Sequence, residues 1–349
     1  MSARAQTAAA PPAGLADKVR FLARPDAYPG RPERVETVET HMAWVFLTDR
    51  FAYKLKKPVR YDYLDFSTVE ARRRDGLAEV RLNRRLAAGV YLGIVPLTWE
   101  DDPGGGTLAL DGEGEVLDWL VQMRRLPSDR MLDRALAEGT ATADDVLRAA
   151  RLLAVFYRDA PPVAITPGEY RKRFRRDLEE IRRELSREEF RLPAGRVERV
   201  ATALLTFVED RGRLLDGRVT PVGAGRIVEA HGDLRPEHVC LTPEPVVIDC
   251  LEFNRGFRLL DPADELAFLS LECERLGAAW VGERFVAVYR SETGDRPPPE
   301  LFRFYQGFRA ALRAKLAAWH TRDDARRNGA EWLAEAADYL GWAERYIRG

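Results

Sequence analysis

Cysteine and histidine are scarce in this sequence, and their scarcity narrows the chemistry that it can support. Only three cysteines and four histidines occur among 349 residues, and no two cysteines form a CxxC pair. Neither a zinc site built from paired cysteines nor a disulfide framework is therefore expected. We predict that Cys240, Cys250 and Cys273 are free thiols in a reducing compartment, which favours a cytoplasmic location.

An excess of charge of one sign is also absent, as are long apolar runs. The 55 basic residues nearly cancel the 56 acidic ones, so the composition indicates no nucleic-acid partner. No apolar run reaches the length that spans a bilayer, so no membrane partner is expected. Residues 1–14 lack the apolar core of a signal peptide and are rich in alanine and proline, which predicts a disordered tail.

The GxxxxGK[ST] signature of a P-loop does not occur, so no P-loop nucleotide site is expected. Apolar residues, by contrast, make up 46% of the sequence, which is enough to bury a sizeable core. The length suits two lobes or domains. Nothing in the sequence indicates an oligomeric state.

Residues 15–122 carry a mixed pattern that predicts a small β-rich lobe with one long helix. Alternating apolar and polar residues early in this region predict a three-stranded antiparallel meander. We expect strands at 35–40, 43–48, 51–57, 94–97, 108–110 and 116–123. The long helix is expected at 68–87, where Ser67 or Thr68 can cap its first turn.

Residues 123–349 are expected to be mostly helical. An amphipathic helix is predicted at 144–157, where apolar residues recur at helical spacing. Residues 170–189 are dense in charges of both signs, and we predict a solvent-facing helix there. Further helices are expected at 197–214 and 301–319.

The stretch HGDLRPEHVCLTPEPVVID, residues 231–249, is the most informative part of the sequence. A turn marked by Pro243 and Pro245 separates two short apolar runs, which predicts a loop followed by a β-hairpin. This arrangement would bring the carboxylates of Asp233 and Asp249 to one place. Such a pair suits phosphoryl transfer, in which one carboxylate accepts the proton of the attacking hydroxyl and the other holds Mg²⁺.

The motifs HGDLRPEH, VVIDCLEFN and LLDPADELAFL together resemble a bacterial family of aminoglycoside phosphotransferase-like enzymes, relatives of the protein kinases. The resemblance implies an α+β, two-lobed protein kinase-like fold. Its N-lobe, residues 15–122, would be a small antiparallel β-sheet, and its C-lobe, residues 123–349, would be mostly helical. Some members of the family carry an additional P-loop domain, and this sequence resembles the kinase-like domain alone.

The resemblance implies a role for each carboxylate and for a lysine on the third strand. Asp233 would be the catalytic residue and Asp249 a metal ligand. Lys54 fits the position of the lysine that grips the nucleotide phosphates best, with Lys56 on the same strand face as the alternative. Glu79, on the long helix, is the expected partner of that lysine.

Two methionines complete the nucleotide contacts that the resemblance implies. Met42 lies in the turn between the first two strands, where many kinases have a glycine-rich phosphate loop and this sequence has no glycine. Met123 lies close to the junction of the lobes, where the backbone of residues 122–124 would meet the adenine ring.

His238 departs from the family pattern, which has an asparagine as a magnesium ligand at this position. Imidazole suits softer divalent ions better than hard Mg²⁺. Several interpretations are open. His238 binds metal, contacts a phosphate or has a structural role, or one metal held mainly by Asp249 suffices, or the protein is impaired as a kinase.

The predicted helix 301–319 carries two arginines within or beside its apolar arc, Arg309 and Arg313. Charged side chains in such positions are seldom buried without a partner. Two interpretations are open. The arginines form ion pairs with carboxylates such as Asp261 or Asp264, or they bind an acceptor that bears a carboxylate or phosphate.

The expected function is transfer of the γ-phosphate of ATP or GTP, with Mg²⁺ or alternatively Mn²⁺, to a hydroxyl of a small-molecule acceptor. A nucleotide-binding pseudokinase or regulatory module is a second interpretation, supported by His238 and the glycine-free turn. A Ser/Thr protein kinase is a third. It is less favoured because Cys250-Leu251, rather than Phe-Gly, follow Asp249.

Overall fold

The computed structural model describes residues 13–61, 63–101, 106–219, 225–323 and 328–348. The tail expected at residues 1–14 lies almost entirely outside these ranges. The chain divides into two compact units. The N-terminal unit comprises Met1–Leu126 with Glu252–Asn254, and the C-terminal unit comprises Pro127–Leu251 with Arg255–Gly349.

The N-terminal unit is built on a six-stranded antiparallel sheet of order β1-β2-β3-β8-β6-β7. Its strands are β1 (Glu36–Glu39), β2 (Ala43–Leu47), β3 (Phe51–Lys56), β6 (Tyr91–Glu100), β7 (Thr107–Leu110) and β8 (Glu115–Arg124). The predicted meander of the first three strands is confirmed. The alternation of apolar side chains fixes its register, because Phe46, Leu55 and Leu120 are fully buried in one core.

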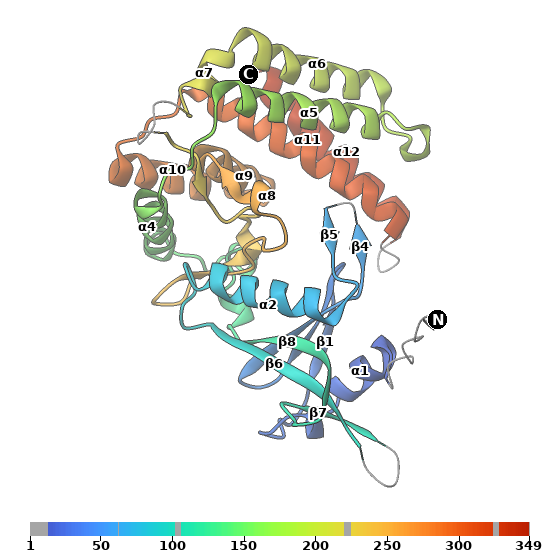
Figure 1. Cartoon of the computed structure of the whole chain (residues 1–349). Coiled ribbons are helices and arrows are strands. Elements are labelled where there is room, and N and C mark those ends of the chain that lie inside the picture. Colours follow the sequence, from blue (N-terminus) through green and yellow to red (C-terminus); the bar gives the residue numbers. More distant parts are fainter. Residues whose placement is uncertain (1–12, 62, 102–105, 220–224, 324–327, 349) are drawn as a thin grey trace, which may run out of the picture. The chain divides into compact units, whose positions relative to one another are not determined.

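Helix α2 (Val69–Asn83) runs along the face of strands β8 and β6 (Figure 1). It begins at Thr68, whose hydroxyl accepts a hydrogen bond from the Ala71 amide, as the sequence predicted. Gly76 lets the helix approach the sheet closely. A Cβ atom there would lie 3.2 Å from a methyl carbon of Ile94. This close packing brings Glu79, which is fully buried, to the sheet.

The remaining elements of the N-terminal unit are short. They are α1 (Leu15–Leu22), the 3₁₀ turn η1 (Pro25–Ala27), and the two-residue strands β4 (Arg60–Tyr61) and β5 (Leu64–Asp65), which pair with each other. Two basic residues, Lys18 of α1 and Arg72 of α2, bind the buried carboxylate of Asp118 on β8, at 2.8 and 2.7 Å. These contacts tie both helices to the central part of the sheet.

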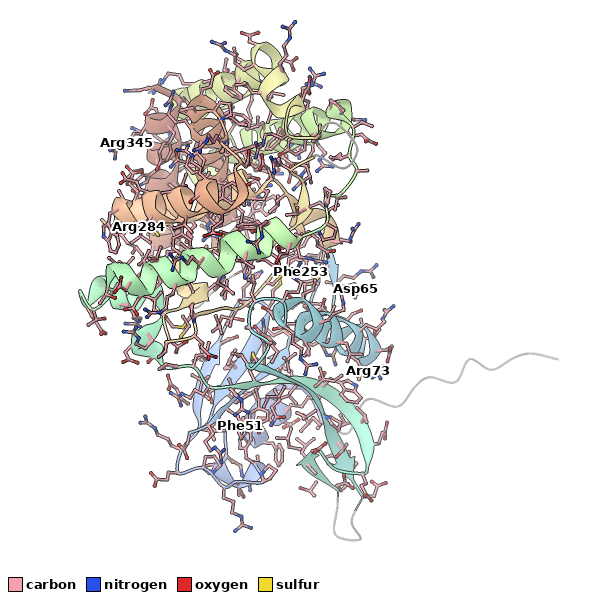
Figure 2. The ribbon with its side chains drawn as sticks, turned by 90° about the vertical axis from the view of Figure 1, so that its left-hand side faces the viewer. Phe51, Asp65, Arg73, Phe253, Arg284 and Arg345 are labelled. Carbon is pink, nitrogen blue, oxygen red and sulfur yellow. The ribbon has the colours of Figure 1, made fainter. Side chains whose placement is uncertain are left out.

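Helices dominate the C-terminal unit, as the sequence predicted. They are α3 (Leu132–Ala137), α4 (Ala143–Asp159), α5 (Pro167–Leu185), α6 (Ala194–Asp210), α7 (Gly212–Asp216), α8 (Arg255–Arg258), α9 (Pro262–Arg275), α10 (Ala279–Thr293), α11 (Pro299–Asp323) and α12 (Gly329–Arg348). Helices α5, α6, α11 and α12 lie alongside one another (Figure 1). Charged side chains such as Arg284 and Arg345 remain on the surface (Figure 2).

The prediction of a solvent-facing helix at 170–189 was wrong. Apolar residues recur along α5 at helical spacing and are buried in the core with α6 and α11. They are Tyr170, Phe174, Leu178, Ile181 and Leu185. The charges occupy the other faces, so α5 is amphipathic.

Short strands shape the segment between α7 and α9. Strand β10 (Val239–Cys240) pairs with β11 (Val246–Val247), which confirms the predicted hairpin, and β9 (Val228–Glu229) pairs with β12 (Leu259–Leu260). The 3₁₀ turn η4 (Pro236–His238) precedes the hairpin, and η2 (Ser128–Arg130) and η3 (Glu188–Phe190) lie elsewhere in the unit. The loop that carries Asp233 therefore lies between paired strands on both sides.

The three cysteines are buried and form no disulfide bond with one another, as the sequence predicted. Across the described ranges, each helix is too short or too polar to cross a bilayer.

Candidate active site

Strand β3 places Lys54 and Lys56 on one face, and both lysines contact Glu79 of α2. The Lys54 ammonium lies 3.0 Å from Oε1 of Glu79, and the Lys56 ammonium lies 2.6 Å from Oε2. One buried carboxylate thus bridges two ammonium groups. The structure brings together the lysine and glutamate that the sequence analysis paired, and it adds the alternative lysine to the same cluster.

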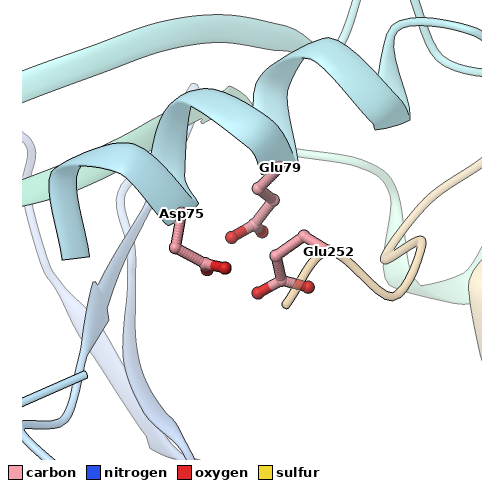
Figure 3. Close-up of side chains that lie close together, drawn as sticks. All are labelled: Asp75, Glu79 and Glu252. Atoms are coloured by element: carbon pink, nitrogen blue, oxygen red, sulfur yellow. The ribbon is translucent and has the colours of Figure 1, made fainter. Parts of the chain in front are cut away.

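Two further carboxylates converge on Lys56. Asp75 of α2 lies 2.7 Å from its ammonium, and Glu252 forms an ion pair with it. Asp75, Glu79 and Glu252 point toward one another (Figure 3). Three carboxylates so arranged could hold a metal ion, but the Lys56 ammonium already supplies the positive charge that they share. We therefore interpret this group as a lysine–carboxylate cluster.

The two lysines differ in their surroundings. Burial alone would lower the pKa of Lys56, but the charges of Glu252, Glu79 and Asp75 raise it above its usual value. Its side chain is 3% exposed, whereas that of Lys54 is 16% exposed. Lys54 is therefore better placed to contact a ligand, and Lys56 is held inside the cluster.

The two methionines lie at different places on the sheet. Met42 is in the turn between β1 and β2, where its carbonyl accepts a hydrogen bond from the Lys57 amide at 2.8 Å. Met123 pairs with Ala52 in the sheet, so its side chain shares a face with Ala52 and Lys54. The backbone at Met123 lies in register with both β3 and β6. The buried side chain of Met123 therefore points to the same side of the sheet as the side chain of Lys54.

In the C-terminal unit, Glu265 of α9 holds the backbone of the loop that contains Asp233. Its carboxylate accepts hydrogen bonds from the amides of His231, at 3.1 Å, and Gly232, at 2.6 Å. The hydroxyl of Tyr157 donates a third hydrogen bond, at 2.7 Å. A fully buried carboxylate with three donors fixes the loop before Asp233, which is an architectural role.

The backbone conformation at position 232 requires a glycine. Its φ is 96°, in the region that residues with a side chain rarely adopt. A Cβ atom there would also lie 3.0 Å from Cβ of Leu251 and 3.1 Å from Cγ of Arg258. The loop therefore cannot accommodate a larger residue without moving its neighbours.

The imidazole of His231 is fully buried, and both ring nitrogens have partners. Nε2 lies 2.8 Å from the Ile248 carbonyl, so it carries the hydrogen and donates it. Nδ1 accepts a hydrogen bond from the Asp233 amide at 3.3 Å. A neutral ring satisfies both contacts. Burial, followed by the neighbouring His238, lowers the pKa of His231 to about 4.

This low pKa predicts that the protein loses stability in mild acid. The pKa of an unfolded histidine is about 6.5, so the unfolded state takes up a proton first as the pH falls. Stability should therefore decrease from pH 6.5 to about pH 4, by about 3 kcal/mol in total. Urea unfolding across this range measures the change. His231→Gln should be less stable but show a flatter pH dependence, and an unchanged slope would contradict the assignment.

Asp233 follows this fixed backbone, and its carboxylate binds Arg235. The guanidinium lies 3.1 Å from Oδ2 of Asp233 and also pairs with Glu237. Burial alone would raise the pKa of Asp233, but the charges of Arg235, and then of His238 and Arg313, lower it to about 2. Asp233 is therefore ionised at neutral pH.

His238 lies between the two aspartates. Its Nδ1 is 2.7 Å from the Asp233 carbonyl, so Nδ1 carries a hydrogen and donates it. Its Nε2 is 3.6 Å from Oδ2 of Asp249. In a neutral ring, Nε2 presents a lone pair to a carboxylate oxygen, and this arrangement is stabilised only when a cation or a proton binds there. The donor set therefore fits a divalent cation.

Asp249 has a strained backbone. Its φ is 61°, in the left-handed region, although it is not a glycine. Its side chain remains 45% exposed, in contrast to its buried neighbour Cys250. The left-handed conformation at the end of the hairpin leaves this carboxylate accessible.

The two arginines of α11 have different surroundings in the structure. Arg309 is buried and binds both carboxylate oxygens of Asp264, at 2.7 and 2.8 Å, which confirms the ion-pair interpretation for this residue. Asp261 instead binds Arg218 and caps α9 through the Ala263 amide. Arg313 is half-buried, and its guanidinium lies over the ring of Tyr339.

The sequence analysis missed Arg235 and Asp75. Arg235 lies within the HGDLRPEH motif, two residues from Asp233, so its proximity could have been recognised from spacing alone. Asp75 lies one helical turn before Glu79, and this spacing places both carboxylates on one face of α2.

Comparison with known proteins identifies relatives of uncharacterized function. No protein-family model matches the chain. A protein of Mycobacterium tuberculosis (strain H37Rv), described only as uncharacterized, is 35% identical over 298 residues, which are 83% of this chain and 56% of that protein. An uncharacterized protein of Mycobacterium bovis matches to the same extent. The chain thus spans about half the length of the curated relatives that it matches.

Solved structures show which fold this is. A choline/ethanolamine kinase family protein from Mesorhizobium loti superposes with a TM-score of 0.51 at 14% identity, covering 95% of this chain and 98% of that one. A thermostable mutant of the aminoglycoside phosphotransferase APH(4)-Ia gives a TM-score of 0.52 at 13% identity, covering 94% and 98%. The antiparallel sheet, the helical unit and these two superpositions together show that the chain has the α+β, protein kinase-like fold of the aminoglycoside phosphotransferases.

Proposed function

We propose that this protein transfers the terminal phosphoryl group of ATP or GTP to a hydroxyl of a small molecule. The observation that carries the proposal is the loop at Asp233. Glu265 and His231 fix its backbone, and His238 contacts both the Asp233 carbonyl and the Asp249 carboxylate. A fixed, ionised carboxylate beside a second, accessible carboxylate is the arrangement that phosphoryl transfer uses. The fold, shared with kinases of small molecules, supports the same assignment.

In this proposal Asp233 orients the acceptor hydroxyl and takes its proton. A bond forms between the hydroxyl oxygen and the γ-phosphorus, while the bond from the γ-phosphorus to the bridging oxygen breaks. The electron pair of that bond remains on the β-phosphate of the departing nucleoside diphosphate, and the proton passes from Asp233 to solvent. Lys54, held by Glu79, would bind the phosphates, and Met42 and Met123 would contact the nucleotide.

Asp249 and His238 would hold the divalent cation. Mg²⁺ or Mn²⁺, when bound, neutralises charge on the β- and γ-phosphates. One carboxylate is a sufficient protein ligand for Mg²⁺, which keeps several waters, whereas imidazole nitrogen suits Mn²⁺ better.

A nucleotide-binding pseudokinase is the second candidate function, favoured by His238 in place of the usual asparagine. A direct test separates the two. The full chain is incubated with ATP or GTP, with Mg²⁺ or Mn²⁺, and with neutral, anionic and cationic hydroxyl compounds, and nucleoside diphosphate and phosphorylated product are measured. Transfer to an acceptor supports the kinase. Nucleotide binding without turnover under every condition would instead establish the pseudokinase.

The His238→Asn substitution tests the metal assignment. If the imidazole is a ligand, the asparagine amide oxygen should favour the harder ion, and the ratio of kcat/KM with Mg²⁺ to that with Mn²⁺ should rise by about tenfold. An unchanged ratio at unchanged stability would assign His238 a structural role through its bond to the Asp233 carbonyl. The His231→Gln variant is the comparison, because both ring nitrogens of this neighbouring imidazole already have backbone partners, so its loss should leave the metal preference unchanged.

A further inference from the structure

Four arginines of the C-terminal unit lie on the loop of Asp233, on α9 or on α11, and three of them are neutralised by carboxylates. Arg235 pairs with Asp233 and Glu237, Arg275 with Glu272 and Asp338, and Arg309 with Asp264. Each guanidinium therefore has at least one counterion within ion-pair distance. The carboxylates of these pairs lie on α9, on α12 and on the loop itself.

Arg313 differs from these three. Within the described ranges, no carboxylate lies within 4.0 Å of its guanidinium, and its Nε is buried without a hydrogen-bond partner. The guanidinium lies over the ring of Tyr339, 5.5 Å from the centroid. The Tyr339 hydroxyl donates to Glu272, at 2.9 Å, which fixes the ring. A cation that rests on an aromatic ring and keeps an unused donor is prepared to bind an anion.

Arg313 and the loop of Asp233 are connected through α9. Arg313 is one helical turn along α11 from Arg309, whose partner Asp264 immediately precedes Glu265, and Glu265 binds the Gly232 amide. The charge of Arg313 is also among those that lower the pKa of Asp233, as expected for groups that lie close together. An acceptor whose hydroxyl reaches Asp233 would therefore bring its other substituents near Arg313.

We propose that Arg313 binds a carboxylate or phosphate group of the acceptor, so that the protein phosphorylates small hydroxyl compounds that carry an anionic group. This inference rests on the proposed function. A guanidinium can offer two parallel donors to either oxyanion, and this geometry gives specificity as well as affinity. A cationic acceptor would be repelled by the same charge.

A binding experiment tests the anion site independently of catalysis. The melting temperature of the full chain is measured with rising concentrations of inorganic phosphate or malonate, with ADP and Mg²⁺ present throughout. Wild type should be stabilised by at least one of these anions, and Arg313→Gln should lose that response. Arg284→Gln, at an exposed arginine of α10 (Figure 2), is the matched control and should respond as wild type does. An equal response in Arg313→Gln, or none in wild type, would overturn the proposal.

A kinetic experiment compares acceptors that differ in one anionic group. The pairs are glycerol with glycerate and ribose with ribose 5-phosphate, and choline and streptomycin represent cationic acceptors. Wild type should prefer an anionic member, and the two pairs show whether carboxylate or phosphate is recognised. Arg313→Gln should raise KM for that acceptor by about tenfold or more, with a smaller change in kcat. Arg313→Lys, which keeps the charge but not the paired donors, should recover part of the loss.

The two hypotheses fail in different ways. Transfer that favours choline, streptomycin or the neutral member of each pair, and that Arg313→Gln leaves unchanged, would refute the anionic acceptor and leave the kinase assignment intact. An anion response that depends on Arg313, without transfer to any acceptor, would refute the kinase assignment and retain the anion site. A lower melting temperature in Arg313→Gln with unchanged KM would make Arg313 a structural residue, as Arg309 is.

Discussion

Replacement of Asp233 by asparagine is expected to slow phosphoryl transfer by about 10²–10⁴-fold, the usual contribution of a positioned general base. An amide has nearly the same shape but cannot accept the proton of the hydroxyl. Nucleotide affinity should change little, because the proposal assigns the phosphates to Lys54 and the cation. The quantities to measure are kcat and the Kd of the nucleotide in the same preparation.

Loss of the ion pair to Arg235 complicates this test, so a second variant is needed. Asp233 and Glu237 share the guanidinium of Arg235. Glu237→Gln therefore removes a neighbouring carboxylate from the same arginine without removing the proposed base. Because the Asp233 side chain is 31% exposed, either substitution should cost about 1 kcal/mol of stability or less. If both variants slow transfer equally, Asp233 is not the base.

The fold was predictable where local pattern determines structure. The alternating strands at 35–57, the cap at Thr68 and the turn between β10 and β11 each depend on residues close together in the sequence. The loop that carries Asp233 was predictable for a related reason. Its glycine, histidine and aspartate are consecutive, and His231 contacts the Asp233 amide directly.

The error at α5 shows how composition can mislead. Charged residues are dense in this helix, and their density led to the prediction of a solvent-facing helix. Its few apolar residues nevertheless recur at helical spacing, from Tyr170 to Leu185, and all are buried. Helix burial depends on the spacing of apolar residues rather than on their number. The periodicity needed to predict this packing was present in the sequence.

Apart from Glu79, which the family resemblance paired with the lysine of the third strand, the partners of the two lysines could not be predicted. The sequence placed Lys54 and Lys56 on one strand face and offered no physical basis for distinguishing their roles beyond the family pattern. Their difference arises from Asp75 and Glu252, which contact Lys56 through tertiary packing. The difference between the two arginines of α11 likewise arises from tertiary packing. Only the packing of α9 against α11 assigns Asp264 to Arg309, while Arg313 has no carboxylate at ion-pair distance among the residues that the structure describes.

Lys56→Met is expected to cause the largest loss of stability among the variants considered. Lys56 is 3% exposed and neutralises Asp75 and Glu252, while it shares Glu79 with Lys54. Removing the cation takes away the ion-pair partner of the mostly buried Asp75 and one positive charge from both Glu79 and Glu252, which costs about 3–5 kcal/mol. Urea unfolding of the full-length variant, compared with that of the wild type, measures this loss.

Lys54→Met is the matched control on the same strand face. It leaves Glu79 paired with Lys56, so its cost should be about 1 kcal/mol or less, while nucleotide affinity should fall. Adding Asp75→Asn to Lys56→Met removes one uncompensated charge and should restore part of the stability, which a double-mutant cycle quantifies. If Lys54→Met is the more destabilising variant and Lys56→Met alone weakens nucleotide binding, then the two lysines have exchanged roles, and Lys56 is the residue that binds the phosphates.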